Sequence, residues 1–222
     1  INDIKVSPLV RVDPLYLEVG TNTPPPYDKK PMFTLFSQEE KTVIDDDGEH
    51  TCVITCSHAT EEALLKEPSD KLAGKTPYGL DAYKNRGVSV VREDRELFLD
   101  QNFYNGQNTQ DRFWKIEVKF NSDLDFYFGI THDKQSVKTL ERAFDRRLKT
   151  VKDPAQFKIY LEEAADTKNE FAYIIAQRVY DLSLKLRAKV KEIRSTKNDP
   201  TKDNGGGPST TVTNEAAMAI AR

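Results

Sequence analysis

GVSVVREDRELFLD (residues 87–100), RFWKIEVKF (112–120) and NSDLDFYFGITHDKQSV (121–137) form the stretch of sequence that decides the fold. Val88–Val91 and Glu96–Leu99 predict two strands joined by a charged turn. In the next segment apolar and charged side chains alternate, which predicts an antiparallel strand with one buried and one solvated face. The buried face carries Trp114, Ile116, Val118 and Phe120, and the solvated face carries Lys115, Glu117 and Lys119.

The segments before this stretch add further strands. Strands are predicted at Met32–Phe36 and His50–Ser57, and Asp45–Gly48 predicts a turn between them. Residues 101–110 are rich in Asn, Gln and Gly and predict an exposed loop. The order of elements predicts an α+β fold, an α/β sandwich with a mixed, mainly antiparallel sheet of about four strands and helices on one face.

A long helical extension is predicted after the sheet. Asp153–Gln156 is a strong helix start, with a capping residue, proline at the first position and glutamine at the third. The helix is expected to run to Ile193 with a break near 166–169. Its apolar seam is narrow and nearly heptad-spaced, which predicts packing on one partner helix rather than in a core. The seam consists of Ile175, Val179, Leu182, Leu186 and Val190.

Length and composition set the domain organisation. The 222 residues carry a net charge of −3, which gives no general attraction to nucleic acid or to anionic membranes. No apolar run approaches the ~20 residues that span a bilayer, and the chain is expected to be cytoplasmic. We expect a connector at 1–31 from a missing N-terminal domain, an α/β domain at 32–150, the helical extension at 151–195 and a flexible linker at 196–222. The start at Ile1 rather than Met suggests the downstream part of a longer protein.

The two cysteines lie in the run HTCVITCSH, and a zinc site there is tempting because His50, Cys52, Cys56 and His58 share one strand face. Strand geometry argues against it. His50 and His58 would lie ~26 Å apart at ~3.3 Å per residue, whereas zinc ligands lie within ~2.3 Å of the metal. The cysteines are therefore predicted to be small buried side chains in a reducing compartment.

One residue is a candidate for contact with a substrate. Lys134 lies on a loop between the strand region and a predicted helix, and a long cationic side chain there suits the terminal phosphate of a nucleotide. The competing interpretation is an ordinary surface lysine. The sequence contains neither of the common glycine-rich phosphate loops and no nucleophile-elbow serine, so the residues alone define no active site.

The runs GVSVVREDREL and GITHDKQSV, with TPYGLDAYKNRGVSVVR before them, resemble the second half of the ATPase module of the GHKL superfamily (gyrase B, Hsp-type chaperones, histidine kinases and MutL). The likeness is closest to bacterial Hsp-like ATPases and to the ATPase modules of Microrchidia (MORC) proteins. In those proteins a strand G-V-x-V-x-R-x-x-R-E-L and a loop T-x-x-K-Q recur in the transducer subdomain. The likeness covers roughly residues 10–150.

The resemblance implies a role for three loop residues. Lys134 would act catalytically by contacting the terminal phosphate of ATP, with Gln135 and Thr131 beside it. ATP and Mg²⁺ would be held mainly by an N-terminal nucleotide-binding domain of the same protein, and closure on ATP would promote homodimerisation. Gyrase-type proteins place the glutamine before the lysine, whereas here Lys134 precedes Gln135. The sequence carries no Mg²⁺-binding asparagine helix, no D-x-G-x-G and no lid, so this fragment alone is not expected to hydrolyse ATP.

The alternative function is a non-catalytic scaffold. In that case the basic end of the last helix would bind nucleic acid or a partner helix, although the acidic character of the whole chain favours a solvated helix face. The basic residues are Lys185, Arg187, Lys189, Lys191 and Arg194.

Overall fold

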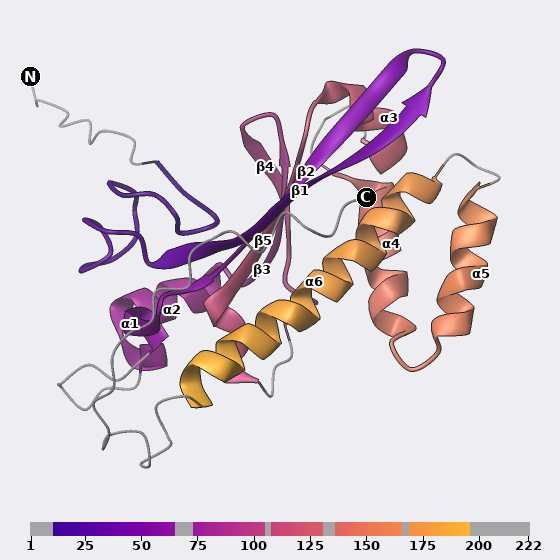
Figure 1. Ribbon diagram of the computed structural model, residues 1–222. Coiled ribbons are helices and arrows are strands. Elements are labelled where there is room, and N and C mark those ends of the chain that lie inside the picture. Colours follow the sequence, from indigo (N-terminus) through magenta and orange to yellow (C-terminus); the bar gives the residue numbers. More distant parts are fainter. Residues whose placement is uncertain (1–10, 65–72, 105–107, 131–135, 166–168, 196–222) are drawn as a thin grey trace, which may run out of the picture.

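The computed structural model describes residues 11–64, 73–104, 108–130, 136–165 and 169–195. It has the predicted α+β architecture, with a five-stranded mixed sheet in the order β1-β2-β5-β3-β4 (Figure 1). The β3–β5 pair is parallel, and the other three pairs are antiparallel. The strands are β1 Phe33–Asp45, β2 Gly48–Ala59, β3 Gly87–Arg92, β4 Arg95–Asp100 and β5 Trp114–Phe120.

Helices α4 and α6 pack on each other, and α6 lies along one face of the sheet over β2 and β5 (Figure 1). The 3₁₀ turns are η1 Ala73–Lys75, η2 Thr109–Phe113 and η3 Ser122–Leu124. The α-helices are α1 Glu61–Leu64, α2 Pro77–Lys84, α3 Asp125–Phe128, α4 Lys138–Lys149, α5 Pro154–Ala165 and α6 Glu170–Ser195.

The sequence locates most of these elements correctly. The β3–β4 and β1–β2 hairpins, strand β5 and the start of α5 are confirmed, and the backbone N–H of Gln156 donates to Asp153 Oδ1 at 3.1 Å as the capping pattern requires. Strand β1 is longer than predicted and continues to Asp45. Its second half, SQEEKTVID, has no regular apolar alternation because β1 is an edge strand and both of its faces are largely solvated there.

The prediction that the α6 seam packs on a single helix is wrong. Helix α6 contacts α4, α5 and the sheet, and all five seam residues are buried in the main core. The apolar face is broader than the seam, because Phe171, Ala172 and Ala176 are buried beside it. A stripe this wide suits a sheet face rather than a two-helix contact. Residues beyond 151 therefore complete the core beneath the sheet.

Two segments predicted to be irregular are partly buried. Phe103, in the predicted exposed loop, is buried with its ring 5.3 Å from that of Phe144 at an interplanar angle of 90°. In the predicted connector, residues 11–31 form no helix or strand, but Tyr16 and Tyr27 are buried in the core. Isolated aromatic residues within polar stretches carry no periodic signal, so a pattern-based reading places them at the surface.

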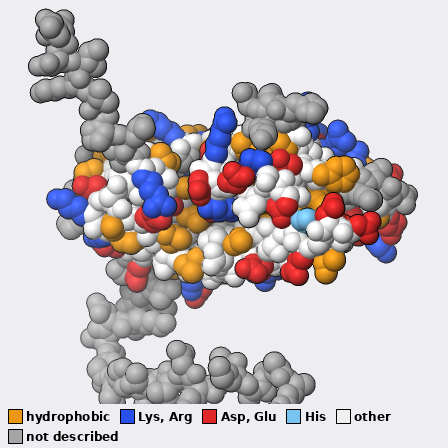
Figure 2. All heavy atoms as spheres, turned by 90° about the horizontal axis from the view of Figure 1, so that it is seen from above, with side chains coloured by type: hydrophobic (Ala, Val, Ile, Leu, Met, Phe, Trp, Pro, Cys, Tyr) orange, Lys and Arg blue, Asp and Glu red, His pale blue; other side chains and the backbone are white. Residues whose placement is uncertain are grey.

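The described surface mixes both charge signs. On the face drawn in Figure 2, acidic, basic and apolar side chains are interspersed without a large patch of one sign. Among the described helices, none combines the length and apolar character needed to cross a membrane.

Candidate functional site

Thr131, Lys134 and Gln135 lie outside the described residues, but both ends of their loop are described. Ile130 and Val137 form an isolated antiparallel bridge, and the backbone N–H of Lys138 donates to Gly129 O at 3.2 Å. The two ends of the segment 131–135 are therefore held together immediately before α4.

An ion pair links α3, just before this segment, to β3, the strand that carries the motif GVSVVREDREL. Arg92, at the end of β3, donates from Nε to Asp125 Oδ1 at 2.7 Å and from Nη2 to Asp125 Oδ2 at 3.0 Å. Asp125 begins α3, and its backbone oxygen accepts the N–H of Ile130 at 2.9 Å. A bidentate arginine–carboxylate pair fixes orientation as well as distance. The strand motif is thus joined to α3, four residues before the loop motif begins at Gly129.

Gly129 gives the chain its sharp change of direction between α3 and the loop. Its φ is +68°, and an added Cβ would lie 2.8 Å from the backbone nitrogen of Thr139. We expect Gly129→Ala to lower the free energy of unfolding by about 1–2 kcal/mol, measured by urea denaturation. Gly20→Ala is the matched control, because Gly20 has φ +72° but nothing within 4 Å of an added Cβ. Equal losses in both variants would mean that crowding against Thr139 does not matter.

Lys115 corrects the prediction that its face of β5 is solvated. Only 2% of Lys115 is exposed, and its Nζ has no hydrogen-bond partner among the described residues. The side chain lies on the sheet face opposite α6, where residues 11–22 cover this end of the sheet. Tyr16 comes from that covering segment, and its ring centroid lies 5.4 Å from Lys115 Nζ.

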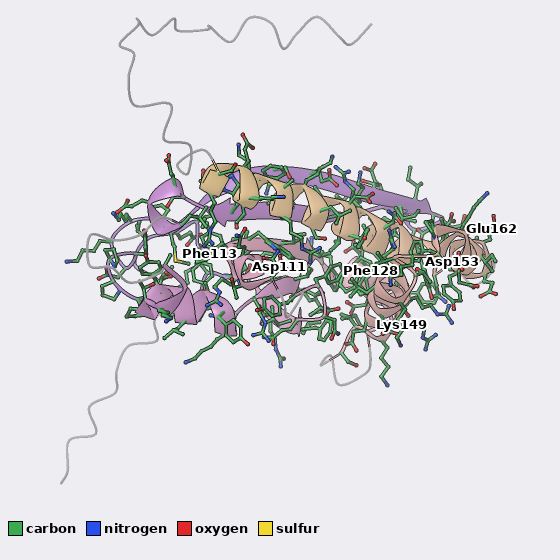
Figure 3. All side chains as sticks on the ribbon, turned by 90° about the horizontal axis from the view of Figure 1, so that it is seen from below. Asp111, Phe113, Phe128, Lys149, Asp153 and Glu162 are labelled. Carbon is green, nitrogen blue, oxygen red and sulfur yellow. The ribbon has the colours of Figure 1, made fainter. Side chains whose placement is uncertain are left out.

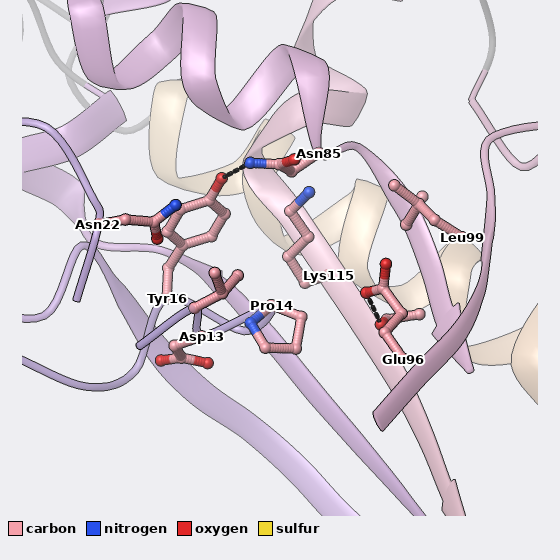
Figure 4. A pocket seen from close by; sticks show the side chains of 11 residues that line it. Asp13, Pro14, Tyr16, Asn22, Asn85, Glu96, Leu99 and Lys115 are labelled. Atoms are coloured by element: carbon pink, nitrogen blue, oxygen red, sulfur yellow. Dashed lines mark hydrogen bonds between the residues drawn. The ribbon is translucent and has the colours of Figure 1, made fainter. Parts of the chain in front are cut away.

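Lys115 lines a cavity of about 60 Å³ (Figure 4). Polar groups converge there from α2 and the covering segment: the Tyr16 hydroxyl donates to Asp81 Oδ2 at 2.7 Å and accepts from Asn85 Nδ2 at 3.0 Å. On the other side, the Ser89 hydroxyl donates to Glu96. The remaining lining residues are Val12, Asp13, Pro14, Asn22, Gly87 and Leu99.

Burial dominates the electrostatics of this cavity. Desolvation lowers the pKa of Lys115 to about 7, and Arg86 lowers it further, while Asp81 and Glu96 oppose the shift. Burial also raises the pKa of Tyr16 far above its ordinary value, with Asp81 acting in the same direction, so Tyr16 remains a neutral phenol. The cavity therefore presents an amine that is partly unprotonated at neutral pH.

The lowered pKa of Lys115 predicts a pH dependence of stability. Between pH ~7 and ~10.4 the unfolded chain binds a proton at this lysine that the folded chain does not, so stability rises as pH rises. We expect wild-type unfolding free energy to increase by about 1–2 kcal/mol more than that of Lys115→Met between pH ~7 and ~8.5. Parallel urea denaturation series would measure this. Identical pH profiles would show that Lys115 keeps its ordinary pKa.

Sequence reasoning missed Lys115 because its alternation with Glu117 and Lys119 is that of a solvated strand face. Two signals point the other way. The residues paired with Lys115 on its neighbours are small, Ser57 on β2 and Gly87 on β3. The apolar run at 15–17 also needs a surface on which to pack, and the Ser57 hydroxyl donates to the backbone oxygen of Leu15 at 2.8 Å.

Part of the basic cluster at the end of α6 is turned inward. Arg187 Nε donates to Asp111 Oδ1 at 3.1 Å, and the guanidinium of Arg194 lies 5.2 Å from the Phe113 ring centroid. Figure 3 labels Asp111 and Phe113 near this end of α6. These two arginines pack against the core, and of the three lysines of the cluster Lys189 pairs with Glu192 at 3.1 Å.

The cysteines are small buried side chains, as predicted. Cys52 and Cys56 are free thiols, and burial raises the pKa of Cys52 to about 12 and that of Cys56 to about 11. His50 instead lies at the far end of β2, where its ring contacts Asp45 and Asp123. In the part of the chain that the structure describes, no group of three or more His, Cys, Asp or Glu side chains is arranged to hold a metal ion.

The chain was compared with models of protein families, with curated proteins and with solved structures, and none of them matches it. The function is therefore inferred from the residues and their arrangement.

Proposed function

We propose that this chain is the transducer part of a cytoplasmic GHKL-type ATPase. Lys134 contacts the terminal phosphate of ATP, which an N-terminal nucleotide-binding domain of the same protein holds together with Mg²⁺. The Arg92–Asp125 ion pair is the observation that carries the proposal, because it ties the strand motif to α3, immediately before the loop motif.

The arrangement around the loop suits a sensor of bound nucleotide. The loop base is fixed to β3 through Arg92 and to the start of α4 through the Ile130–Val137 bridge. Helix α4 in turn packs on α6, and Arg146 of α4 donates to the hydroxyl of Tyr173 on α6 at 2.7 Å. In this proposal the contact between Lys134 and the terminal phosphate exists only while ATP is intact. Forming the contact would shift the loop together with β3, α4 and α6, and hydrolysis would reverse that shift.

The nucleotide pocket belongs to the other domain in this proposal, so the 222-residue chain alone is expected to release phosphate from ATP no faster than a buffer blank. A colorimetric phosphate assay with Mg²⁺-ATP measures this. Turnover by the purified chain would place a complete active site within it and would contradict the division of labour between two domains.

The alternative function, a non-catalytic module that binds nucleic acid through the end of α6, has less support. Two of its five basic residues, Arg187 and Arg194, lie against Asp111 and Phe113 rather than in solvent. Lys189 also pairs with Glu192 at 3.1 Å. A phosphate-binding surface needs free cations, and this helix offers few of them.

A further inference from the structure

We propose that Lys115 is a covalent binding site for small carbonyl compounds, which it holds as a protonated imine inside the cavity between β5 and residues 11–22. Three observations support this inference. The amine is almost fully buried, its Nζ has no hydrogen-bond partner among the described residues, and it lines a cavity rather than packed protein. A buried polar group without a partner is costly, so a cavity beside it calls for an occupant.

The amine is prepared for nucleophilic attack by its surroundings. Desolvation lowers the pKa of Lys115 to about 7, which leaves a large fraction as the free amine at neutral pH. The charged groups that face it are Asp81 and Arg86 from the α2 side and Glu96 from β4. Asp13 lines the cavity from the covering segment, and the Tyr16 phenol stays neutral.

The chemical step balances with groups that line the cavity. The Nζ lone pair adds to the carbonyl carbon, the C=O π pair takes a proton, and the nitrogen releases one, which gives a neutral carbinolamine. The hydroxyl then leaves as water with a second proton, so that amine, carbonyl and one net proton give an iminium ion and water. Glu96 lines the same cavity, and the proposal assigns the transfer of these protons to its carboxylate. Its carboxylate and that of Asp81 favour a cationic product, and they would oppose the anionic carbamate that CO₂ would form on the same amine.

The size of the cavity limits the carbonyl compound. Its volume of about 60 Å³ corresponds to roughly two water molecules. One- or two-carbon aldehydes therefore fit within it. A wider groove of about 700 Å³ on the same sheet face shares Val12, Pro14 and Glu96 with the cavity. The tail of a longer aldehyde or ketone would lie along this groove, past Glu117 and Lys119.

Reductive methylation tests the proposal on the wild-type chain. The chain would be treated at pH ~7 with ¹³C-formaldehyde and cyanoborohydride, and the methylated lysines mapped by peptide mass spectrometry. We expect Lys115 to be modified at least about tenfold faster than Lys119, since about half of an amine with pKa ~7 is unprotonated but only about one in 3,000 of an ordinary lysine. Lys119 is the internal control, because its side chain is 44% exposed on the same strand. Labelling of Lys115 no faster than Lys119 would overturn the proposal.

Two variants separate chemistry from folding. Lys115→Met is expected to remove the fast site and leave the labelling of Lys119 unchanged. Glu96→Gln is expected to slow labelling of Lys115 several-fold, because the cavity then lacks its proton carrier. Unchanged labelling in Glu96→Gln would remove Glu96 from the mechanism. None of these measurements involves ATP, so their outcome is independent of the proposed ATPase role.

Discussion

Asp111→Ala is expected to lower the free energy of unfolding by about 3–5 kcal/mol. Asp111 is only 1% exposed, and its Oδ1 accepts from Arg187 Nε at 3.1 Å, Trp114 Nε1 at 3.3 Å and Asn108 Nδ2 at 3.0 Å. Removing the carboxylate deprives the buried indole N–H of its acceptor and leaves Arg187 without its counter-charge beside the backbone oxygen of Phe103. Breaking one side of a buried, hydrogen-bonded pair costs far more than the pair contributes.

Urea denaturation of the wild type and three variants would measure the effect. Asp111→Asn keeps an acceptor oxygen and is expected to lose less than Asp111→Ala. Asp94→Ala is the matched control, because Asp94 pairs with Lys119 at 2.9 Å but its side chain is 96% exposed, and solvent-exposed pairs contribute little to stability. Similar losses in Asp111→Ala and Asp94→Ala would show that Asp111 does not organise the junction between α6, η2 and β5.

Asp111 also illustrates what the sequence reveals and what it hides. Strand β5 is evident from its alternation, since one face must be apolar to meet a core. The acceptor that satisfies its tryptophan is not evident, because Asp111 directly follows the polar stretch 101–110 that reads as a loop. Its partner Arg187 is 76 positions away in a cluster that reads as a solvated basic face. Local patterns report which side of an element is apolar, but they do not report which distant polar groups pair.

The same distinction explains Lys115 and the α6 seam. The alternation in β5 is real, but a second layer covers the outer face at one end because Tyr16 and Leu15 pack there. A segment without helix or strand has no periodic pattern of apolar residues, so the sequence does not show that it covers the sheet. The spacing identifies the five residues of the α6 seam but not their partner, because heptad-like spacing describes a helix face and not the surface that covers it.

Lys134→Ala in the protein that contains both domains is expected to reduce kcat for ATP hydrolysis by about 10²–10³-fold, the usual cost of removing one preorganised donor to a developing charge. The loss should fall mainly on kcat, because most contacts to ATP belong to the other domain in this proposal. Steady-state phosphate release at saturating ATP measures kcat, and a nucleotide-binding titration measures any change in affinity.

The control is Lys152→Ala, which removes an exposed lysine between α4 and α5 and should leave turnover unchanged. Arg92→Ala is a second, independent test of the proposal. It keeps Lys134 but removes the ion pair with Asp125 that holds α3, next to the loop, against β3. A positioning role for Arg92 predicts a lower kcat that Arg92→Lys restores only in part, because lysine cannot form the bidentate pair. If Lys134→Ala turns over ATP at the wild-type rate, Lys134 is a surface lysine, and the Arg92–Asp125 pair beside the loop is structural alone.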